Sequence, residues 1–306
     1  MTKETADWIA VDWGTSALRL WAMRADGSVL AARESDQGMA RLTPDGFEPA
    51  LLALAAPLLD PGRVTDVVIC GMAGARQGWI EAPYAPVPCS PLSQLPVRAP
   101  ARDGRIAVHV LAGLSQAEPP DVMRGEETQI AGFLAHEPQF DGVLCLPGTH
   151  TKWVILRGGC VREFHTVMTG ESFALYSEHS VLRHVMEPGW DASAFAAAVG
   201  QGRDRPESVA TALFAIRARA MLDPAGAALP GVARARLSGL LLGLELAATR
   251  SIWQGRAVVV LGAPALCAHY IDALEASDAP AVRFDRDEPA RAGLAVAHQR
   301  IVKGAA

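Results

Sequence analysis

The stretch WIAVDWGTS, residues 8–16, is a short apolar segment that runs into a turn of small and hydroxyl-bearing residues. Its apolar part predicts a buried strand, and Gly14 permits a tight turn where that strand ends. Residues 17–23 and 29–33 are two further strand candidates, and an Asp-Gly turn separates them. The chain is therefore predicted to open as a three-stranded meander.

The same pattern recurs from residue 143. The buried strand candidate VLCL, residues 143–146, ends in a Pro-Gly-Thr-His turn, and two more strand candidates follow. Each half then continues as helices, strand, helix, strand, helix, with helices expected at residues 47–59, 126–136, 265–275 and 288–299. This order predicts an α/β protein of two like-folded mixed domains, residues 1–140 and 141–306, with a cleft between them.

The length, charge and composition of the chain indicate its number of domains and exclude some classes of binding partner. A chain of 306 residues suits two domains. The net charge of −5, without a basic run, argues against binding to nucleic acid or to an anionic membrane. The five cysteines form no C-x-x-C pair, and no apolar run of ~20 residues or N-terminal signal core is present. We expect a cytoplasmic protein with reduced core thiols.

Several familiar catalytic signatures are absent from the sequence. It contains no GxxxxGK[ST] loop, no complete GxGxxG fingerprint, no HExxH and no GxSxG. These absences argue against a P-loop enzyme, an NAD-dependent oxidoreductase, a zinc protease and an α/β-hydrolase.

The first turn could bind phosphate. Asp12 ends a buried strand, and Gly14, Thr15 and Ser16 supply a tight turn with hydroxyl and N–H groups. Asp12 would orient Mg²⁺ through water while the turn donates hydrogen bonds to phosphate oxygens. An ordinary polar hairpin explains the same residues equally well.

The second turn, LCLPGTHTK at residues 144–152, has the same form and could hold phosphate from the other domain. Gly148, Thr149 and Thr151 are its candidate contacts, and Lys152 is either a phosphate partner or a solvated strand residue. Each turn alone is weak evidence. Their equivalent places in two similar halves make a shared polyphosphate site a more specific prediction.

Two adjacent carboxylates, Glu126 and Glu127, begin the helix that leads into the second half. Neighbouring helix residues point about 100° apart, so only one of them can face a given cleft. That one could accept a proton from an attacking hydroxyl as general base. Acidic residues in a first helical turn also occur without any catalytic role.

Two further segments could contact ligands. Gly262 and Ala263 end a strand and leave space for a flat group such as adenine, although a plain strand-to-helix turn has the same form. Arg76 could grip a carboxylate with two hydrogen bonds, and Trp79 could pack on a sugar. A loop arginine can equally be solvated.

The order of motifs resembles the 2-dehydro-3-deoxygalactonokinase family of the actin, sugar kinase and Hsp70 superfamily, and the resemblance covers essentially the whole chain. The motifs are DWGTS (12–16), GMAGARQGW (71–79), RGEETQIAG (124–132), LCLPGTHTKWV (144–154), TGESFAL (169–175) and LGAPAL (261–266). The resemblance implies two ribonuclease-H-like domains with mixed five-stranded sheets that flank an ATP cleft. It implies a kinase of galactonate catabolism that phosphorylates 2-dehydro-3-deoxy-D-galactonate on its terminal hydroxyl with ATP and Mg²⁺.

The family pattern also implies site residues. The first phosphate motif falls on Asp12, Gly14, Thr15 and Ser16, the second on Gly148, Thr149 and Thr151, and the adenosine motif on Gly262 and Ala263. Glu126 occupies the place of the general base, with Glu127 as the alternative. Arg76 and Trp79 are our candidates for recognition of the sugar acid.

Three other functions fit parts of the sequence. The first is a kinase for another sugar or sugar acid, and the second is a phosphate-chain hydrolase of the same fold. The third is an ATP-dependent switch, which ranks last because no additional binding segment is evident. Residues 237–248 could supply a homodimer interface.

Overall fold

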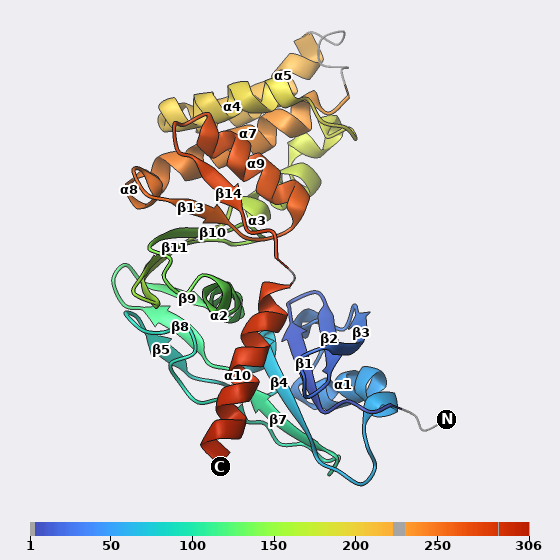
Figure 1. Cartoon of the computed structure of the whole chain (residues 1–306). Coiled ribbons are helices and arrows are strands. Elements are labelled where there is room, and N and C mark those ends of the chain that lie inside the picture. The colour runs from blue at the N-terminus through green and yellow to red at the C-terminus, as the bar shows by residue number, and fades with distance from the viewer. Residues whose placement is uncertain (1–3, 223–229, 287, 306) are drawn as a thin grey trace. The chain divides into compact units, whose positions relative to one another are not determined.

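The computed structural model describes residues 4–222, 230–286 and 288–305 (Figure 1). The chain divides into two compact units, each described by itself below. Unit 1 comprises Met1–Phe140, Arg157–Glu163 and Arg286–Ala306, and unit 2 comprises Asp141–Leu156 and Phe164–Asp285.

Unit 1 is built on a six-stranded sheet with the order β3-β2-β1-β4-β7-β6. The strands are β1 (Trp8–Trp13), β2 (Leu18–Met23), β3 (Val29–Ser35), β4 (Thr65–Gly71), β6 (Val97–Arg98) and β7 (Ile106–Val110). The predicted meander is confirmed, because β2 pairs antiparallel with both β1 and β3. Strands β4 and β7 then extend the sheet in parallel with β1.

The proline-rich part of unit 1 contains more strand than the sequence suggests. The two-residue strand β6 pairs with β7 and makes the sheet six-stranded rather than five-stranded. A second sheet with the order β5-β8-β9 contains β5 (Tyr84–Pro86), β8 (Gly113–Gln116) and β9 (Asp121–Met123). Prolines keep β5 and β6 very short, because a proline cannot donate to a strand ladder.

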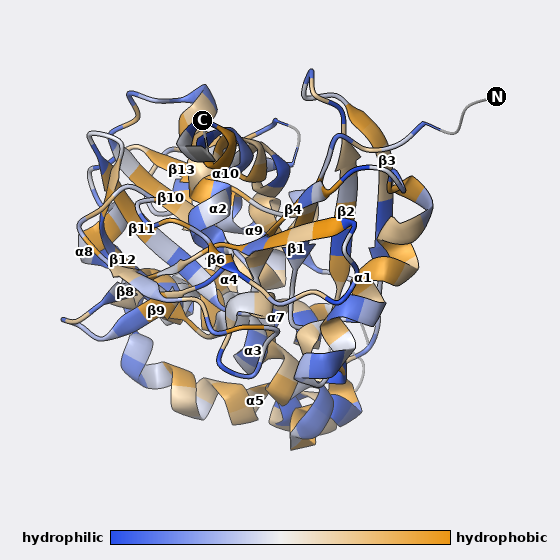
Figure 2. Ribbon diagram, turned by 90° about the horizontal axis from the view of Figure 1, so that it is seen from below, coloured by the Kyte–Doolittle hydropathy of each residue, from blue (hydrophilic) through white to orange (hydrophobic). Residues whose placement is uncertain are grey.

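Strand alternation separates the two hydrophobic layers of unit 1. Ile9, Val11 and Trp13 of β1 pack on one face with helix α1 (Phe47–Ala55). Trp8 and Ala10 face the opposite side, where helices α2 (Glu126–His136) and α10 (Pro289–Ala305) lie. The largely hydrophobic strands β1 and β2 are visible in Figure 2. Short helical turns complete the unit at Met39–Arg41, Pro44–Gly46, Ala56–Leu58 and Met72–Gly74.

The single break expected near residue 140 does not describe the whole chain. Helix α10, expected in the C-terminal domain, belongs to unit 1, where it packs against α2 and β1. The crossing of α2 and α10 is close: a Cβ atom on Gly132 would lie 2.0 Å from the carbonyl oxygen of Pro289. Glycine at this position allows the two helix backbones to touch.

Unit 2 repeats the architecture of the larger sheet. Its five strands are β10 (Gly142–Leu146), β11 (Thr151–Arg157), β12 (Cys160–Val167), β13 (Val258–Val260) and β14 (Ala281–Arg283), in the order β12-β11-β10-β13-β14. Strand β10 pairs antiparallel with β11 and parallel with β13, as β1 does with β2 and β4. The predicted α/β class with a duplicated mixed sheet is confirmed.

The helices of unit 2 occupy the region between β12 and β13 and the C-terminal part. They are α3 (Thr169–Ala174), a π-helical turn (Leu175–His179), short 3-10 turns (Val181–Val185 and Pro206–Ser208), α4 (Ala192–Asp204), α5 (Val209–Leu222), α7 (Val232–Ala248), α8 (Arg250–Trp253) and α9 (Pro264–Glu275). Helix α7 packs against α4. Leu237, Leu240, Leu242 and Leu246 of α7 are buried. Most of the segment considered for a dimer interface therefore packs inside unit 2, whereas Leu244 and Ala248 are exposed.

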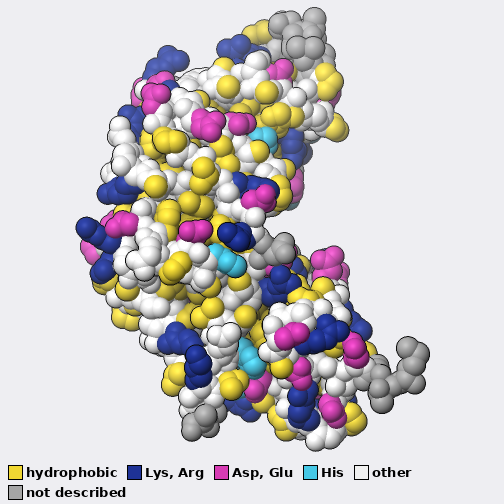
Figure 3. All heavy atoms as spheres, viewed as in Figure 1, with side chains coloured by type: hydrophobic (Ala, Val, Ile, Leu, Met, Phe, Trp, Pro, Cys, Tyr) yellow, Lys and Arg dark blue, Asp and Glu magenta, His cyan; other side chains and the backbone are white. Residues whose placement is uncertain are grey.

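The exposed side chains are of mixed type. Lys and Arg are interspersed with Asp and Glu over the face drawn in Figure 3. Within the described ranges, no helix combines the length and the hydropathy that a membrane span requires.

Candidate active site

Asp12 lies one residue before the end of β1, and its carboxylate has two close neighbours. Its Oδ2 accepts from Nη2 of Arg19 at 2.5 Å, and its Oδ1 lies 3.7 Å from Sγ of Cys70. Arg19 also reaches Oε2 of Glu288 at 3.4 Å. Although burial acts in the other direction, these carboxylates raise the pKa of Arg19. Asp12 is therefore held in place by a permanently charged guanidinium.

The turn after Asp12 presents its tip to solvent. Thr15 and Ser16 are exposed and Gly14 is half-buried. The carbonyl oxygens of Gly14 and Thr15 accept from the backbone N–H groups of Met39 and Ala40, at 3.1 and 3.0 Å. These bonds fix the turn, as a phosphate-binding loop requires.

The two carboxylates at the start of α2 differ in environment. Glu127 is 1% exposed, and it accepts from the backbone N–H of Gly125 at 2.6 Å and from Oγ1 of Thr128 at 2.9 Å. Burial, and then the charge of Glu126, raises the pKa of Glu127 to about 7. Glu126 is only half-buried, and its Oε2 accepts from the backbone N–H of Arg124 at 3.1 Å.

Cys70 interacts with Asp12 and with Glu127, and no motif in the sequence pointed to this role. It is the register partner of Asp12 between β1 and β4. Burial, followed by the charges of Asp12 and Glu127, raises the pKa of the Cys70 thiol. Thr128 also forms a side-chain hydrogen bond with Cys70. The structure thus brings Asp12 and the start of α2 to one edge of the unit 1 sheet.

Arg76 and Trp79, the two candidates for sugar-acid recognition, lie in different surroundings. Arg76 is exposed just after the turn that follows β4. Trp79 is only 9% exposed and packs with Trp13 and Phe47 in the core. Its indole N–H donates to the carbonyl oxygen of Pro100 at 3.0 Å. The core thus covers most of the Trp79 ring and leaves little of it for a sugar to pack on.

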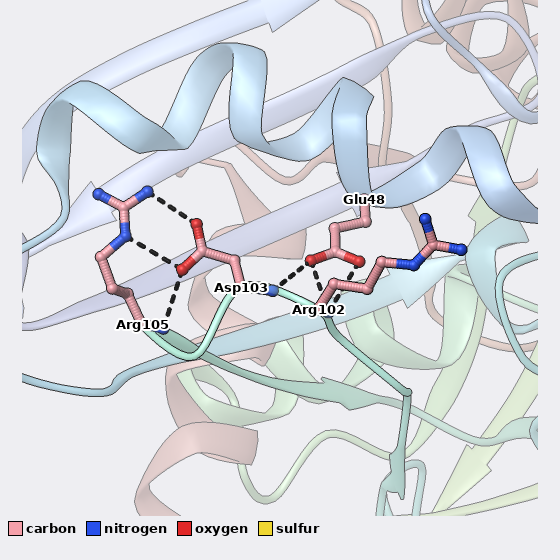
Figure 4. Close-up of polar contacts among 4 residues, drawn as sticks. All are labelled: Glu48, Arg102, Asp103 and Arg105. Atoms are coloured by element: carbon pink, nitrogen blue, oxygen red, sulfur yellow. Dashed lines mark hydrogen bonds and ion pairs between the residues drawn. The ribbon is translucent and has the colours of Figure 1, made fainter.

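A cavity of about 590 Å³ lies beside Trp79, and two of the acidic residues that line it, Glu48 and Asp103, already accept hydrogen bonds. Oε1 of Glu48 accepts from the backbone N–H groups of Arg102 and Asp103 at 2.8 and 2.7 Å (Figure 4). Asp103 in turn accepts from Arg105, and these hydrogen bonds lower the pKa of Asp103. The cluster holds the loop before β7 on α1.

The turn of unit 2 that is predicted to bind phosphate, residues 147–150, is hydrogen-bonded to the start of α3. Thr149 and His150 are exposed, and the carbonyl oxygen of Thr149 accepts from the backbone N–H of Glu171 at 2.9 Å. Nε2 of His150 lies 2.6 Å from Oε2 of Glu171. A Cβ atom on Gly170 would lie 2.2 Å from the carbonyl oxygen of Gly148, so only glycine fits there.

Thr151 and Lys152, also predicted to contact phosphate, point into the protein. Thr151 is fully buried, and its hydroxyl lies 2.7 Å from that of Tyr270. Lys152 is 5% exposed, and its Nζ donates to Oγ1 of Thr166 at 2.6 Å. Strand β11 begins at Thr151, so these side chains belong to its two packed faces rather than to the turn. Neither side chain is exposed at the turn.

A cavity of about 350 Å³ opens beside the same turn, within unit 2. Residues from five segments line it, among them Gly148, Phe173, Trp190, Arg234, Ala265 and His269. The rings of Trp190 and His269 stack with centroids 4.1 Å apart. Cζ of Arg234 lies 5.0 Å from the ring centroid of Phe173. Aromatic faces and a guanidinium suit a flat, electron-rich ligand.

Gly262 and Ala263 directly precede α9, and a Cβ atom on Gly262 would lie 3.4 Å from the carbonyl oxygen of Pro147. Both are exposed, and Ala263 is the N-cap of α9, the helix that supplies Ala265 and His269 to the cavity. Sequence reasoning identified this strand-to-helix turn. It missed Phe173, Trp190 and Arg234, because they come from separate segments that only the fold brings together.

Comparisons with known proteins agree over nearly the whole chain. The family model described as 2-keto-3-deoxy-galactonokinase matches residues 12–297. A protein of Rhizobium meliloti (strain 1021), described as a probable 2-dehydro-3-deoxygalactonokinase, is 41% identical over 300 residues, covering 95% of this chain and 96% of the relative. The 2-dehydro-3-deoxygalactonokinase of Escherichia coli (strain K12) is 33% identical, covering 96% of this chain and 98% of the relative.

Solved structures show the same relationship. A Sinorhizobium meliloti protein whose structure is named for the same activity aligns with a TM-score of 0.84 and 38% identity, covering 96% of this chain and 99% of that one. An activator of 2-hydroxyisocaproyl-CoA dehydratase from Clostridium difficile, solved with bound ADPNP, aligns with a TM-score of 0.53 at 11% identity over 97% of both chains. That second similarity shows the fold alone.

Proposed function

Because the chain belongs to the 2-keto-3-deoxy-galactonokinase family, we propose that it transfers the γ-phosphoryl group of ATP to the C6 hydroxyl of 2-dehydro-3-deoxy-D-galactonate. The observation that carries this proposal is 41% identity to a relative of that description across 95% of the chain. The geometry of each unit supports it, as follows.

Unit 2 would bind the nucleotide. The cavity of about 350 Å³ has a volume typical of a small-ligand site, and its aromatic rings and Arg234 suit an adenine base. Gly148 lines this cavity at the start of the exposed turn, so phosphates extending from it would meet the backbone of Gly148 and Thr149. Gly262 and Ala263 would flank the nucleoside.

Unit 1 would supply the groups that act on the transferred phosphate and on the acceptor. Thr15 and Ser16 would donate hydrogen bonds to phosphate oxygens from the exposed turn. Glu126 would accept the proton of the C6 hydroxyl, since it is the accessible member of the pair. Glu127 is buried, and its hydrogen bonds to Gly125 and Thr128 would fix the start of α2.

Asp12 is the residue that would hold Mg²⁺. A single carboxylate beside a phosphate-binding turn fits this ion, which keeps several waters and binds substrate phosphates. Oδ2 accepts from Arg19 and Oδ1 from the thiol of Cys70, so the protein itself orients the carboxylate that would hold the ion. Bound Mg²⁺ would neutralise charge on the phosphate oxygens.

Arg76 is the candidate for the carboxylate of the sugar acid. Its guanidinium is exposed and can form two parallel hydrogen bonds with a carboxylate. It follows the same strand, β4, that carries Cys70 next to Asp12.

An ADP-release assay tests the proposal. MgATP is supplied with 2-dehydro-3-deoxy-D-galactonate, other 2-dehydro-3-deoxy sugar acids, glycerol, glucose or no acceptor. Release confined to the six-carbon sugar acids supports the kinase, and the ranking within the panel gives its stereochemical preference. Release that ignores the acceptor would indicate a phosphate-chain hydrolase instead.

A further inference from the structure

Unit 2 contains a buried carboxylate that the catalytic proposal does not use. Glu245, on α7, is 1% exposed. Its Oε1 accepts from Nε1 of Trp153 at 2.7 Å, and its Oε2 accepts from the hydroxyl of Tyr270 at 3.0 Å. The side chain of Thr169 forms a further hydrogen bond with it. Burying a carboxylate costs desolvation free energy, so a role beyond stability would explain why a carboxylate stands at this position.

The partners of Glu245 come from the segments that build the nucleotide cavity. Tyr270 lies on α9 and Thr169 begins α3, and both residues line that cavity. The Tyr270 hydroxyl also lies 2.7 Å from Oγ1 of Thr151, the residue that directly follows the phosphate turn. The Glu245 carboxylate on α7 is therefore hydrogen-bonded to α3 and α9, and through Tyr270 it is linked to the start of β11.

Burial raises the pKa of Glu245 to about 7, so the group is not a stable buried ion at neutral pH. A methionine or leucine could fill the same volume without that cost. It could not keep the two hydroxyls and the indole N–H in one arrangement. The polar network fixes the relative positions of its partners through directional hydrogen bonds, which apolar packing does not supply.

We propose that Glu245 is a positioning residue of the nucleotide site, which holds the phosphate turn and α9 in register through Tyr270, Thr151 and Thr169. The inference rests on the proposed function, because it assumes that the cavity of unit 2 takes ATP. Glu245 would act without touching the nucleotide. Removal of the Glu245 carboxylate would weaken nucleotide binding and leave the affinity for the sugar acid unchanged.

Three variants test this inference. Tyr270→Phe removes the hydroxyl that joins Glu245 to Thr151 and keeps the ring that lines the cavity. Glu245→Met removes the acceptor at similar volume. Glu245→Gln is the conservative variant: its carbonyl oxygen can serve Trp153, and its amide can donate to the Tyr270 oxygen if that hydroxyl turns to Thr151.

Trp253→Phe is the matched control. Trp253 lies in the same hydrophobic core, and its indole N–H donates to the carbonyl oxygen of Leu246 at 3.1 Å, away from the cavity. This change also deletes one buried hydrogen bond in unit 2. It should lower the melting temperature without altering nucleotide affinity.

The readouts are the Kd for ADP by calorimetry, the KM values for ATP and for the sugar acid, and the melting temperature. We expect Tyr270→Phe and Glu245→Met to raise the Kd for ADP and the KM for ATP about tenfold, with the KM for the sugar acid unchanged. Glu245→Gln should stay within about threefold of the wild type.

Two results would overturn the inference. If Tyr270→Phe and Glu245→Met bind ADP like the wild type at a temperature where both are folded, Glu245 has only a structural role. The same conclusion follows if Trp253→Phe weakens ADP binding equally. A wild-type protein that binds no ADP would instead refute the proposed function, and the inference with it.

Discussion

The thiol of Cys70 lies 3.7 Å from Oδ1 of Asp12, at the register position where β4 pairs with β1. Because Thr128 forms a side-chain hydrogen bond with the same cysteine, this contact links the end of β1 to the start of α2. Asp12 and Glu126, the two residues with proposed chemical roles, are thus carried by elements that pack on one buried cysteine.

Replacement of Asp12 tests the first of these groups. Asp12→Asn keeps the shape but removes the charge that would orient Mg²⁺ and pair with Arg19. We expect kcat at saturating MgATP to fall about 100-fold or more, since charge neutralisation dominates phosphoryl transfer. Asp26→Asn, in the exposed turn between β2 and β3, is the control and should leave kcat unchanged. An Asp12→Asn enzyme of normal kcat would remove Asp12 from the mechanism.

Substitutions of Glu126 and Glu127, the two carboxylates at the start of α2, should lower kcat by very different factors. Glu126→Gln removes the proposed base, and we expect kcat to fall between about 10²- and 10⁴-fold with little change in either KM. Glu127→Gln keeps the hydrogen bond to Gly125, so its kcat should fall less than about tenfold. Steady-state kinetics of both variants decide the matter. The reverse ranking would assign the base to Glu127.

The buried Glu245 should make stability depend on pH. Its pKa is about 7 in the folded protein and ~4.5 when unfolded, so the folded state holds the proton more tightly between these values. The stabilisation is complete below pH ~4.5 and is lost as the pH rises through about 7, amounting to on the order of 3 kcal/mol.

Urea unfolding of the wild type and of Glu245→Gln at pH 5 and pH 8 measures this effect. The wild type should lose its advantage over the variant as the pH rises, because the amide does not titrate. Glu127 contributes a dependence of the same sign, but it is present in both proteins and cancels in the comparison. A constant difference would show that Glu245 does not titrate in this range.

Arg76 and Trp79 should respond differently to substitution. Arg76→Ala should raise the KM for the sugar acid at least about tenfold and leave the KM for ATP nearly unchanged, as expected for the loss of a charged hydrogen-bonded pair. Trp79→Phe should lower the melting temperature, because the ring packs in the core and its N–H is bonded to Pro100. Equal shifts in both KM values for Arg76→Ala would remove it from substrate recognition.

The duplicated fold was predictable from sequence because its signal is local. An apolar run followed by a glycine-threonine turn occurs once at Asp12 and once at Gly148, and both begin the same order of strands. The return of α10 to unit 1 was not predictable, since it depends on the close crossing at Gly132, a contact between distant segments.

One cause explains why the structure buries several side chains that were predicted to contact ligands. A motif gives the positions of residues along the chain, but the phase of a strand decides which side chains point outward. Thr151 and Lys152 follow the phosphate turn in sequence and yet pack inside β11. Trp79 is covered by residues that lie far away in sequence, among them Phe47. Such burial follows from tertiary packing and not from spacing.

The stoichiometry of products with 2-dehydro-3-deoxy-D-galactonate distinguishes phosphoryl transfer to the sugar acid from hydrolysis of ATP. ³¹P NMR of a completed reaction should show one sugar-acid phosphate ester for each ADP formed, with the phosphate on C6. Equal amounts of ADP and inorganic phosphate, without an ester signal, would contradict the account and identify a hydrolase.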